Sequence, residues 1–261
     1  YPEYRFDRGN LYAKLGRYPE AIADYEAAMR LTPPFPELYF NRGDARAATG
    51  DADGAISDFR YVLDLEPDDL EARISLASLL LDAGQPGAAV AEAMTGLEIT
   101  PLEARLHTTL GLGLLEQSDH AAARQAFDRA LELSPGQTEA LVNRAVAAYE
   151  EGHYDAAVAD LTSVLAADPG DPDLLFNRGL ACEAAGRADE AVADYTEALR
   201  HTDADQAELL YRRGRAYLGL GQQAEADTDL RAHLALGSSS HEQEVSELLG
   251  TQPMALSTST P

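Results

Sequence analysis

Three asparagines recur at a fixed step in this chain, and their amides suit the binding of a polypeptide backbone. Asn41, Asn143 and Asn177 are separated by multiples of 34 residues. A side-chain amide offers both a hydrogen-bond donor and an acceptor, so it can hold the backbone of an extended peptide. Two of these asparagines follow an aromatic residue, Phe40 or Phe176, which can contact the side chains of the same peptide.

The residue types that catalysis needs form no recognisable motif. The sequence holds no phosphate-binding loop, no nucleophile elbow and no paired catalytic histidine. Cys182 is the only cysteine, so no disulfide can form within the chain, and the six histidines make no zinc signature. We therefore expect a protein that is not an enzyme and uses no metal or other cofactor, and we expect Cys182 to be a small buried hydrophobic residue.

The charge of the chain excludes several kinds of partner. Its net charge is −25, from 20 basic and 45 acidic residues, which repels the phosphates of nucleic acids and anionic membrane surfaces. No run of 18 apolar residues could cross a membrane. We expect a cytoplasmic protein that binds neither nucleic acid nor membrane. Because the chain begins at Tyr1 rather than Met, we also expect a processed chain or a piece of a longer one.

The elements that must position the asparagines repeat every 34 residues. A fixed period of this kind indicates a repeat array, in which each unit buries its apolar face against its neighbours. The recurring prolines are Pro33, Pro67, Pro101, Pro135 and Pro169. The recurring alanines are Ala21, Ala55, Ala89, Ala123, Ala157 and Ala191. A third register carries Gly16, Gly50, Gly84, Ser118, Gly152 and Gly186.

Each repeat unit is predicted to contain two helices separated by a glycine turn. In one unit, the amphipathic runs are 173–185 and 188–199, on either side of Gly186. The units are 2–35, 36–69, 70–103, 104–137, 138–171, 172–205 and 207–240, and positions are counted from the first residue of each. Beyond them, Val245, Leu248 and Leu249 predict a short capping helix within 241–250, and 251–261 is predicted to be a disordered tail.

An ion pair inside the unit is predicted by comparing the units with one another. Arginine occupies position 7 in five units, and aspartate occupies position 23 in the same five. The two units with leucine at position 7, Leu76 and Leu110, carry Glu92 and Ala126 at position 23. The predicted pairs are Arg8–Asp24, Arg42–Asp58, Arg144–Asp160, Arg178–Asp194 and Arg213–Asp229.

The sequence resembles the tetratricopeptide repeat family over residues 2–240. Unit one carries the family's small, aromatic and proline positions as Gly9, Tyr12, Tyr18, Ala21, Tyr25, Ala28 and Pro33. Departures are the absence of tryptophan, Ala93 and Gly96 in unit three, and Asp203 in place of a proline. The resemblance implies an all-α right-handed solenoid of seven helix–turn–helix repeats plus the capping helix. The RNA-binding pentatricopeptide repeat has a similar period, but its basic surface is inconsistent with this charge.

The resemblance also implies a concave groove lined by positions 2, 5, 6, 9, 12 and 13 of the first helices. The expected peptide-binding residues are Phe6, Asn10, Phe40, Asn41, Asp44, Ile74, Asn143, Phe176, Asn177, Tyr211, Arg212 and Arg215. Several of these positions also fit a purely structural role. Acids at position 2 complement the helix dipole, apolar residues at position 5 can pack between units, and the asparagines fit a habit of the family.

The expected partner is a protein or peptide that is basic or of mixed apolar character. Members of the family that bind a chaperone's C-terminal carboxylate use two lysines, an arginine and two asparagines. Asn10 and Asn41 match that clamp, but Phe6, Glu71 and Ser75 do not, so this clamp is not expected. Only the far end, with Arg212 and Arg215, could take an acidic terminus. The expected function is therefore an interaction scaffold or adaptor, with a regulatory or sensor segment of a longer protein, or a self-association module, as alternatives.

Overall fold

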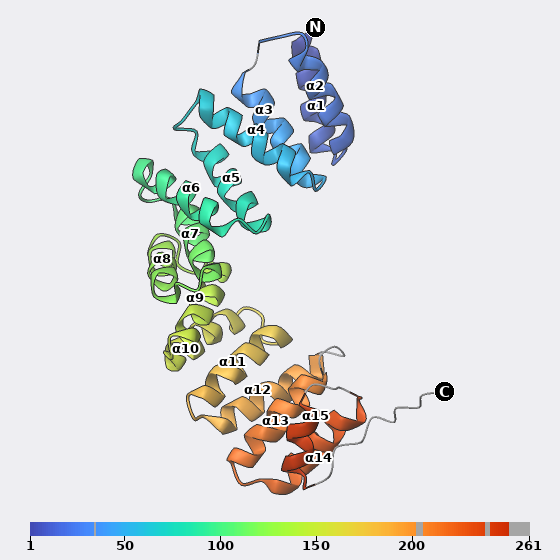
Figure 1. Cartoon of the computed structure of the whole chain (residues 1–261), viewed down its shortest axis with the longest axis vertical. Helices are drawn as coiled ribbons and strands as arrows, with labels where there is room; N and C mark the ends of the chain where they lie inside the picture. Colours follow the sequence, from blue (N-terminus) through green and yellow to red (C-terminus); the bar gives the residue numbers. More distant parts are fainter. Residues whose placement is uncertain (34, 202–205, 238–240, 251–261) are drawn as a thin grey trace, which may run out of the picture. The chain divides into compact units, whose positions relative to one another are not determined.

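The chain is helical throughout the residues that the structure, a computed structural model, describes: 1–33, 35–201, 206–237 and 241–250. Asp203 and the expected disordered tail at 251–261 lie outside these residues. No strand occurs in the described ranges, and most consecutive helices contact one another, so the fold is an all-α repeat solenoid, as the sequence predicts (Figure 1).

The first helix of each unit has an odd label and the second an even one. The first helices are α1 Pro2–Lys14, α3 Pro36–Ala48, α5 Leu70–Asp82, α7 Ala104–Glu116, α9 Thr138–Glu150, α11 Pro172–Ala184 and α13 Gln206–Gly219. The second helices are α2 Tyr18–Met29, α4 Ala52–Leu65, α6 Pro86–Ile99, α8 His120–Leu133, α10 Tyr154–Leu165, α12 Ala188–His201 and α14 Gln223–Ala235. The short helix α15 follows at Glu242–Leu248.

Two compact parts, residues 1–143 and 144–261, are described separately. In the first part, α1 to α8 form four pairs, and α2, α4 and α6 each contact the first helix of the next pair. In the second part, α11 pairs with α12 and α13 with α14, and α10 and α12 contact the first helices that follow them. Within each part, the same helix packing therefore recurs from one unit to the next.

The turn between the two helices of a unit uses the left-handed backbone region. Gly186 has a φ of 76° between α11 and α12, as the predicted glycine turn requires. Ser118 takes the same place in unit four with a φ of 61°. The turn geometry is thus kept where a residue with a side chain replaces the glycine, at the steric cost that such a residue meets in this region.

Small residues at position 8 let an aromatic ring of the second helix lie against the first. A Cβ atom on Gly179 would lie 2.4 Å from Cε1 of Tyr195, which is fully buried. A Cβ atom on Gly9 or Gly111 would likewise lie too close to the aromatic ring at position 24 of its own unit. Close packing of a ring on bare backbone is therefore the physical reason for glycine at this position.

The departures from the family pattern in unit three are packed by neighbouring side chains. Ala93 is fully buried. A Cβ atom on Gly96 would lie 2.5 Å from Leu106 and 3.0 Å from the side chain of Arg73. Ala93 packs with Ile74 of the same unit and Leu106 of the next one, and Leu106 also occupies the space that a methyl group on Gly96 would need.

All five predicted ion pairs are present, and each joins the two helices of one unit. In every pair, the arginine Nε and Nη2 atoms donate to the two carboxylate oxygens at 2.6–2.9 Å, and the aspartate is buried. This two-bond geometry is the strongest form of the arginine–carboxylate interaction. Unit three makes a different pair, in which Arg73 donates to Glu92 at 2.6 Å.

The capping helix α15 stands in the sequence where the first helix of an eighth unit would begin. His241 follows Ala207, the first residue of the seventh unit, by one 34-residue step. Val245 of α15 is fully buried against Tyr211 and Leu230. Leu249 packs at the edge of this cluster, whereas Leu248 keeps 38% of its surface exposed. The expected cap is therefore present and covers apolar side chains of the last unit.

Candidate functional site

The expected groove positions of the first helices line three pockets. The α1–α3 pocket has a volume of about 290 Å³, and the α5–α7 pocket, which also reaches the start of α9, about 520 Å³. The α9–α11 pocket, in the second compact part, has a volume of about 170 Å³. Most of their lining residues stand at positions 5, 6, 9, 12 and 13, so equivalent positions of different units form pockets in each compact part.

The α1–α3 pocket contains a pair of asparagine amides held in a fixed orientation. Asn10 Oδ1 accepts hydrogen bonds from the Tyr25 hydroxyl at 2.8 Å and from Asn41 Nδ2 at 2.9 Å. Among the described residues, Asn10 Nδ2 and Asn41 Oδ1 have no hydrogen-bond partner. One amide donor group and one amide acceptor therefore remain available in the same pocket, and a peptide group can pair with both kinds.

Asp44 lies in the wall of the same pocket, and its surroundings disfavour its charged form. Part of its side chain is exposed, but the pocket removes enough water from the carboxyl group to raise its pKa to about 6. Burial raises the pKa of the neighbouring Tyr25 to about 12, with a smaller contribution from the charge of Asp44. A cation or hydrogen-bond donor in this pocket would therefore stabilise the ionised carboxylate of Asp44.

We expect Asp44→Asn to raise the thermal unfolding temperature at pH 7.5. Because the pKa of Asp44 is raised in the folded protein, its ionised carboxylate costs stability above pH 6. This cost decreases as the pH falls from 6 to about 3.9, the ordinary pKa of an aspartate side chain. The gain should therefore shrink as the pH drops through 6 and disappear near pH 4. Unfolding temperatures of both proteins across this range test the prediction, and a difference independent of pH would contradict it.

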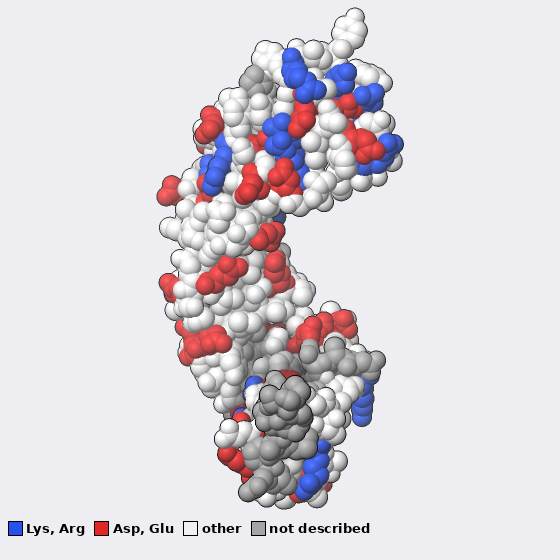
Figure 2. Space-filling model, turned by 45° about the vertical axis from the view of Figure 1, so that its right-hand side comes forward, with Lys and Arg blue, Asp and Glu red and all other residues white. Residues whose placement is uncertain are grey.

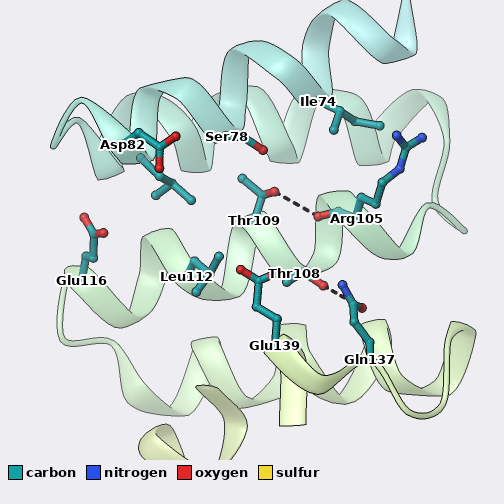
Figure 3. Close-up of a pocket in the computed structure, with 11 residues that line it drawn as sticks. Ile74, Ser78, Asp82, Arg105, Thr108, Thr109, Leu112, Glu116, Gln137 and Glu139 are labelled. Atoms are coloured by element: carbon teal, nitrogen blue, oxygen red, sulfur yellow. Dashed lines mark hydrogen bonds between the residues drawn. The ribbon is translucent and has the colours of Figure 1, made fainter. Parts of the chain in front are cut away.

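The α5–α7 pocket, the largest of the three, has an acidic end and a neutralised basic end (Figure 3). Asp82 and Glu116 lie at one end, and Arg105 lies at the other. Arg105 is bound through two hydrogen bonds, of 2.7 and 2.9 Å, to Glu71, and it also donates to Glu103 at 3.0 Å. Its positive charge is therefore already satisfied within the protein.

Buried threonines and apolar side chains form the middle of the α5–α7 pocket. Thr108 Oγ1 donates to Gln137 Oε1 at 3.1 Å, and Thr109 Oγ1 donates to the Arg105 carbonyl at 3.0 Å (Figure 3). Both threonines are buried. The apolar lining consists of Ile74, Leu81 and Leu112.

The α9–α11 pocket places Asn177 beside apolar side chains. Its lining includes Tyr149, and Val146 and Leu180 stand at the positions that Asn10 and Asp44 occupy in the α1–α3 pocket. Asn177 and Asn41 both stand at position 6 of their units. The two pockets thus keep one amide and differ in the polarity of the wall.

The aromatic residues expected in the groove also pack within their own units. The Phe6 ring centroid is 6.1 Å from that of Tyr25, and Phe176 stands in the same relation to Tyr195 at 6.0 Å. Phe40 contacts Phe59 edge to face at 5.5 Å. These rings are half-buried, so a packing role accounts for part of each surface. Asn143 donates a hydrogen bond to the Glu139 carbonyl of its own helix at 2.9 Å.

The residues expected at the far end of the groove are engaged by other parts of the chain. Tyr211 is buried, its ring stacks on His241 at 3.9 Å, and its hydroxyl donates to Glu244 at 2.8 Å. Arg212 donates to Glu208 at 2.7 Å, and Arg215 lies 3.8 Å from Glu244. In this arrangement the capping helix covers Tyr211, and carboxylates neutralise the cationic patch that an acidic terminus would need.

The residues expected from the sequence did not include most of the α5–α7 pocket. Only Ile74 was among them, whereas Ser78, Asp82, Leu112 and Glu116 line the pocket as well. These residues occupy positions 9 and 13 of units three and four. Both positions are among the groove positions that the family resemblance implies. Reading these two positions in every unit would therefore have identified the pocket residues from the sequence.

Cys182 is buried in the helix packing, away from the groove. Burial, with a smaller contribution from Asp194, raises the pKa of its thiol to about 11. Such a thiol is protonated at neutral pH and behaves as a small hydrophobic residue, as predicted. No group of three His, Cys, Asp or Glu side chains in the described part of the chain is arranged to hold a metal ion.

Family models confirm the resemblance seen in the sequence. A TPR repeat model matches residues 9–50, and tetratricopeptide repeat models match 46–112, 108–172, 142–205 and 207–236. Together they cover nearly all seven units, so the chain belongs to the tetratricopeptide repeat family. Members of this family are generally scaffolds without catalytic activity. No curated protein matches the sequence.

Solved structures of similar fold cover most of the chain. A tetratricopeptide repeat protein from Parabacteroides merdae shares 21% identity, with a TM-score of 0.69 over 95% of this chain and 97% of that one. PilW, a type IV pilus biogenesis factor, shares 20% identity, with a TM-score of 0.66 over 80% and 97%. YrrB, a TPR protein with an unusual peptide-binding site, shares 18% identity, with a TM-score of 0.64 over 70% and 93%. At these identities the likeness concerns the fold.

The helices also bear on the expected relation to membranes. None of the described helices combines the length and the apolar character that crossing a bilayer requires.

Proposed function

We propose that this chain is a protein-interaction scaffold that binds an extended peptide along the groove positions of its first helices. The observation that carries the proposal is the Asn10–Asn41 pair, which holds one amide donor and one amide acceptor unpaired in a pocket. Fixed orientation matters because a preorganised amide loses little entropy when it binds a peptide group. The peptide-binding site named for YrrB is consistent with this use of the fold.

The ligand that fits this groove is basic or of mixed apolar character. The walls contain unpaired carboxylates at Asp82 and Glu116 and an apolar pocket beside Asn177. An acidic terminus is disfavoured, because Arg212 and Arg215 are already engaged by Glu208 and Glu244. A partner helix with the same chemistry is the second form that this ligand can take.

Self-association by end-to-end stacking of units is less well supported. Stacking requires an open apolar face on the last unit, whereas Val245 of α15 is buried against Tyr211 and Leu230 there. A role as the regulatory or sensor segment of a longer protein, and a cytoplasmic location, stay predictions from the sequence.

We expect peptides that bind this chain to depend on the amide of Asn41. An array of random 12-residue peptides would be probed with the full chain, and the strongest binders would be synthesised for titration. Losing one hydrogen-bonding amide should weaken binding of Asn41→Ala about tenfold, on the scale of one to two hydrogen bonds. Asn41 bonds only to Asn10 in the described part of the chain, so its replacement should leave the fold intact.

The matched control is Gln223→Ala, which removes an exposed amide on α14 outside the groove. Binding that is unchanged in Asn41→Ala, or weakened equally in the control, would contradict the proposal. An array without a single binder would contradict it as well.

A further inference from the structure

Two carboxylates of the α5–α7 pocket stand where a helix disfavours negative charge. Asp82 is the last residue of α5, and Glu116 is the last residue of α7. The unpaired carbonyl groups at a helix C-terminus carry a partial negative charge, so an acid there is destabilising and a base is favourable. Neither helix has a basic residue in its last turn.

The two carboxylates also lie together without a compensating cation. Both occupy position 13 of adjacent units, and they share one end of the pocket (Figure 3). Neither has an ion-pair partner in the part of the chain that the structure describes, and the same holds for Glu139, which also lines the pocket. Arg105 contributes no free positive charge, because Glu71 and Glu103 bind it.

One face of the molecule shows an uneven distribution of charge along the first four helix pairs (Figure 2). Lysine and arginine side chains gather over the first two helix pairs, whereas the region of α5 to α8 shows mainly acidic and uncharged atoms in that view (Figure 2). Among the described residues that line the pocket, no basic side chain is left to compensate its acidic end.

The rest of the pocket suits the stem of a long basic side chain. Leu81 and Leu112 supply apolar contacts, and Ile74 continues the apolar lining toward the opposite end. Lysine and arginine side chains commonly lay their methylene groups along apolar surface while the charged head stays at a polar edge. The volume of about 520 Å³ lies within the range of about 300–1,000 Å³ typical of ligand sites.

We propose that the α5–α7 pocket receives a lysine or arginine side chain of an extended peptide bound in the groove. The proposal rests on the peptide-binding function proposed above and adds the chemistry of one subsite. The charged head lies between the exposed carboxylates of Asp82 and Glu116, where it offsets the unfavourable position of both acids at helix C-termini. The stem lies on Leu81 and Leu112, and this apolar contact distinguishes a side chain from a small hydrated cation.

The test compares peptides with and without a basic side chain on a variant that lacks the two charges. Each array binder that contains lysine or arginine would be synthesised with that residue and with methionine in its place. We expect the wild-type chain to prefer the basic version about tenfold, which corresponds to one charge-assisted interaction. The variant Asp82→Asn/Glu116→Gln should lose this preference while it still binds the methionine peptides.

The same variant separates a lost subsite from a lost fold. Because both charges are unfavourable where they stand, removing them should leave the unfolding temperature unchanged or raise it. The control variant Glu66→Gln/Glu98→Gln removes two exposed acids from the C-terminal ends of α4 and α6, outside the pocket. It changes the net charge by the same amount and should keep the preference for basic peptides.

The possible outcomes distinguish this proposal from the one on which it rests. If Asp82→Asn/Glu116→Gln still prefers basic peptides, the proposed subsite is wrong, whereas the proposed peptide binding is unaffected. An equal loss in the control overturns it in favour of general attraction to an acidic protein. A lower unfolding temperature of the pocket variant overturns the premise that the two charges are uncompensated, and the absence of any peptide binder overturns both proposals.

Discussion

Replacing Arg178 by methionine is expected to lower the free energy of unfolding by about 2–3 kcal/mol. The guanidinium donates two hydrogen bonds, of 2.6 and 2.9 Å, to Asp194, whose side chain is only 7% exposed. Methionine keeps most of the volume but leaves a buried carboxylate without its counter-charge. The expected cost is at the low end for a broken buried pair, because 24% of the Arg178 side chain is exposed to solvent.

A double-mutant cycle isolates the interaction from the cost of each substitution. Arg178→Met leaves the charge of Asp194 unpaired, and Asp194→Leu removes that charge. The double variant should therefore be more stable than the sum of the two single losses predicts. We expect a coupling energy of at least about 1 kcal/mol, measured by urea unfolding. The exposed pair Arg187–Glu190 of the same unit is the control and should give less than about 0.5 kcal/mol. A coupling energy near zero at Arg178 and Asp194 would show that the pair is not energetically linked.

Gly179→Ala is expected to destabilise the chain by about 1–3 kcal/mol, the usual range for overpacking a core. The added methyl carbon would lie 2.4 Å from Cε1 of Tyr195. The ring cannot turn aside freely, since it is fully buried and its hydroxyl donates a hydrogen bond to Glu183. The helix α11 must therefore move away from α12, which weakens the contacts that hold this unit together.

The control for this substitution is an exposed glycine in another helix. A Cβ atom on Gly87 of α6 meets no atom within 4 Å, so Gly87→Ala should stabilise the chain by up to about 1 kcal/mol through helix propensity. The two glycine substitutions are thus expected to have opposite signs in thermal unfolding. If both stabilise the chain, the close approach of Gly179 and Tyr195 does not constrain the fold.

Much of the unit could be predicted from the sequence because its constraints are local and repeated. The glycine turn at Gly186 and the helices around it follow from patterns within 34 residues. The ion pairs could also be predicted, since arginine at position 7 and aspartate at position 23 occur in the same units. Seven versions of one unit act as an internal comparison, which a chain without repeats does not offer.

The candidate site could be predicted only in part. Asn10 and Asn41 were expected in the groove, and they lie together in a pocket. Tyr211 was also expected there, but His241 and Glu244, at least 30 residues further along the chain, cover it. The amphipathic pattern predicted a capping helix, but it did not indicate which polar side chains that helix would engage.

The sequence by itself determined the repeat, the helix pairs and the arginine–aspartate pairs, because each depends on residues at fixed separations within one unit. Only the tertiary structure decided which polar groups stay unpaired. Arg105 is neutralised by Glu71 across one repeat step, whereas Asp82 and Glu116 meet no cation in the described part of the chain. Pairing of this kind depends on distances between side chains of different helices, and these distances exist only once the units have stacked.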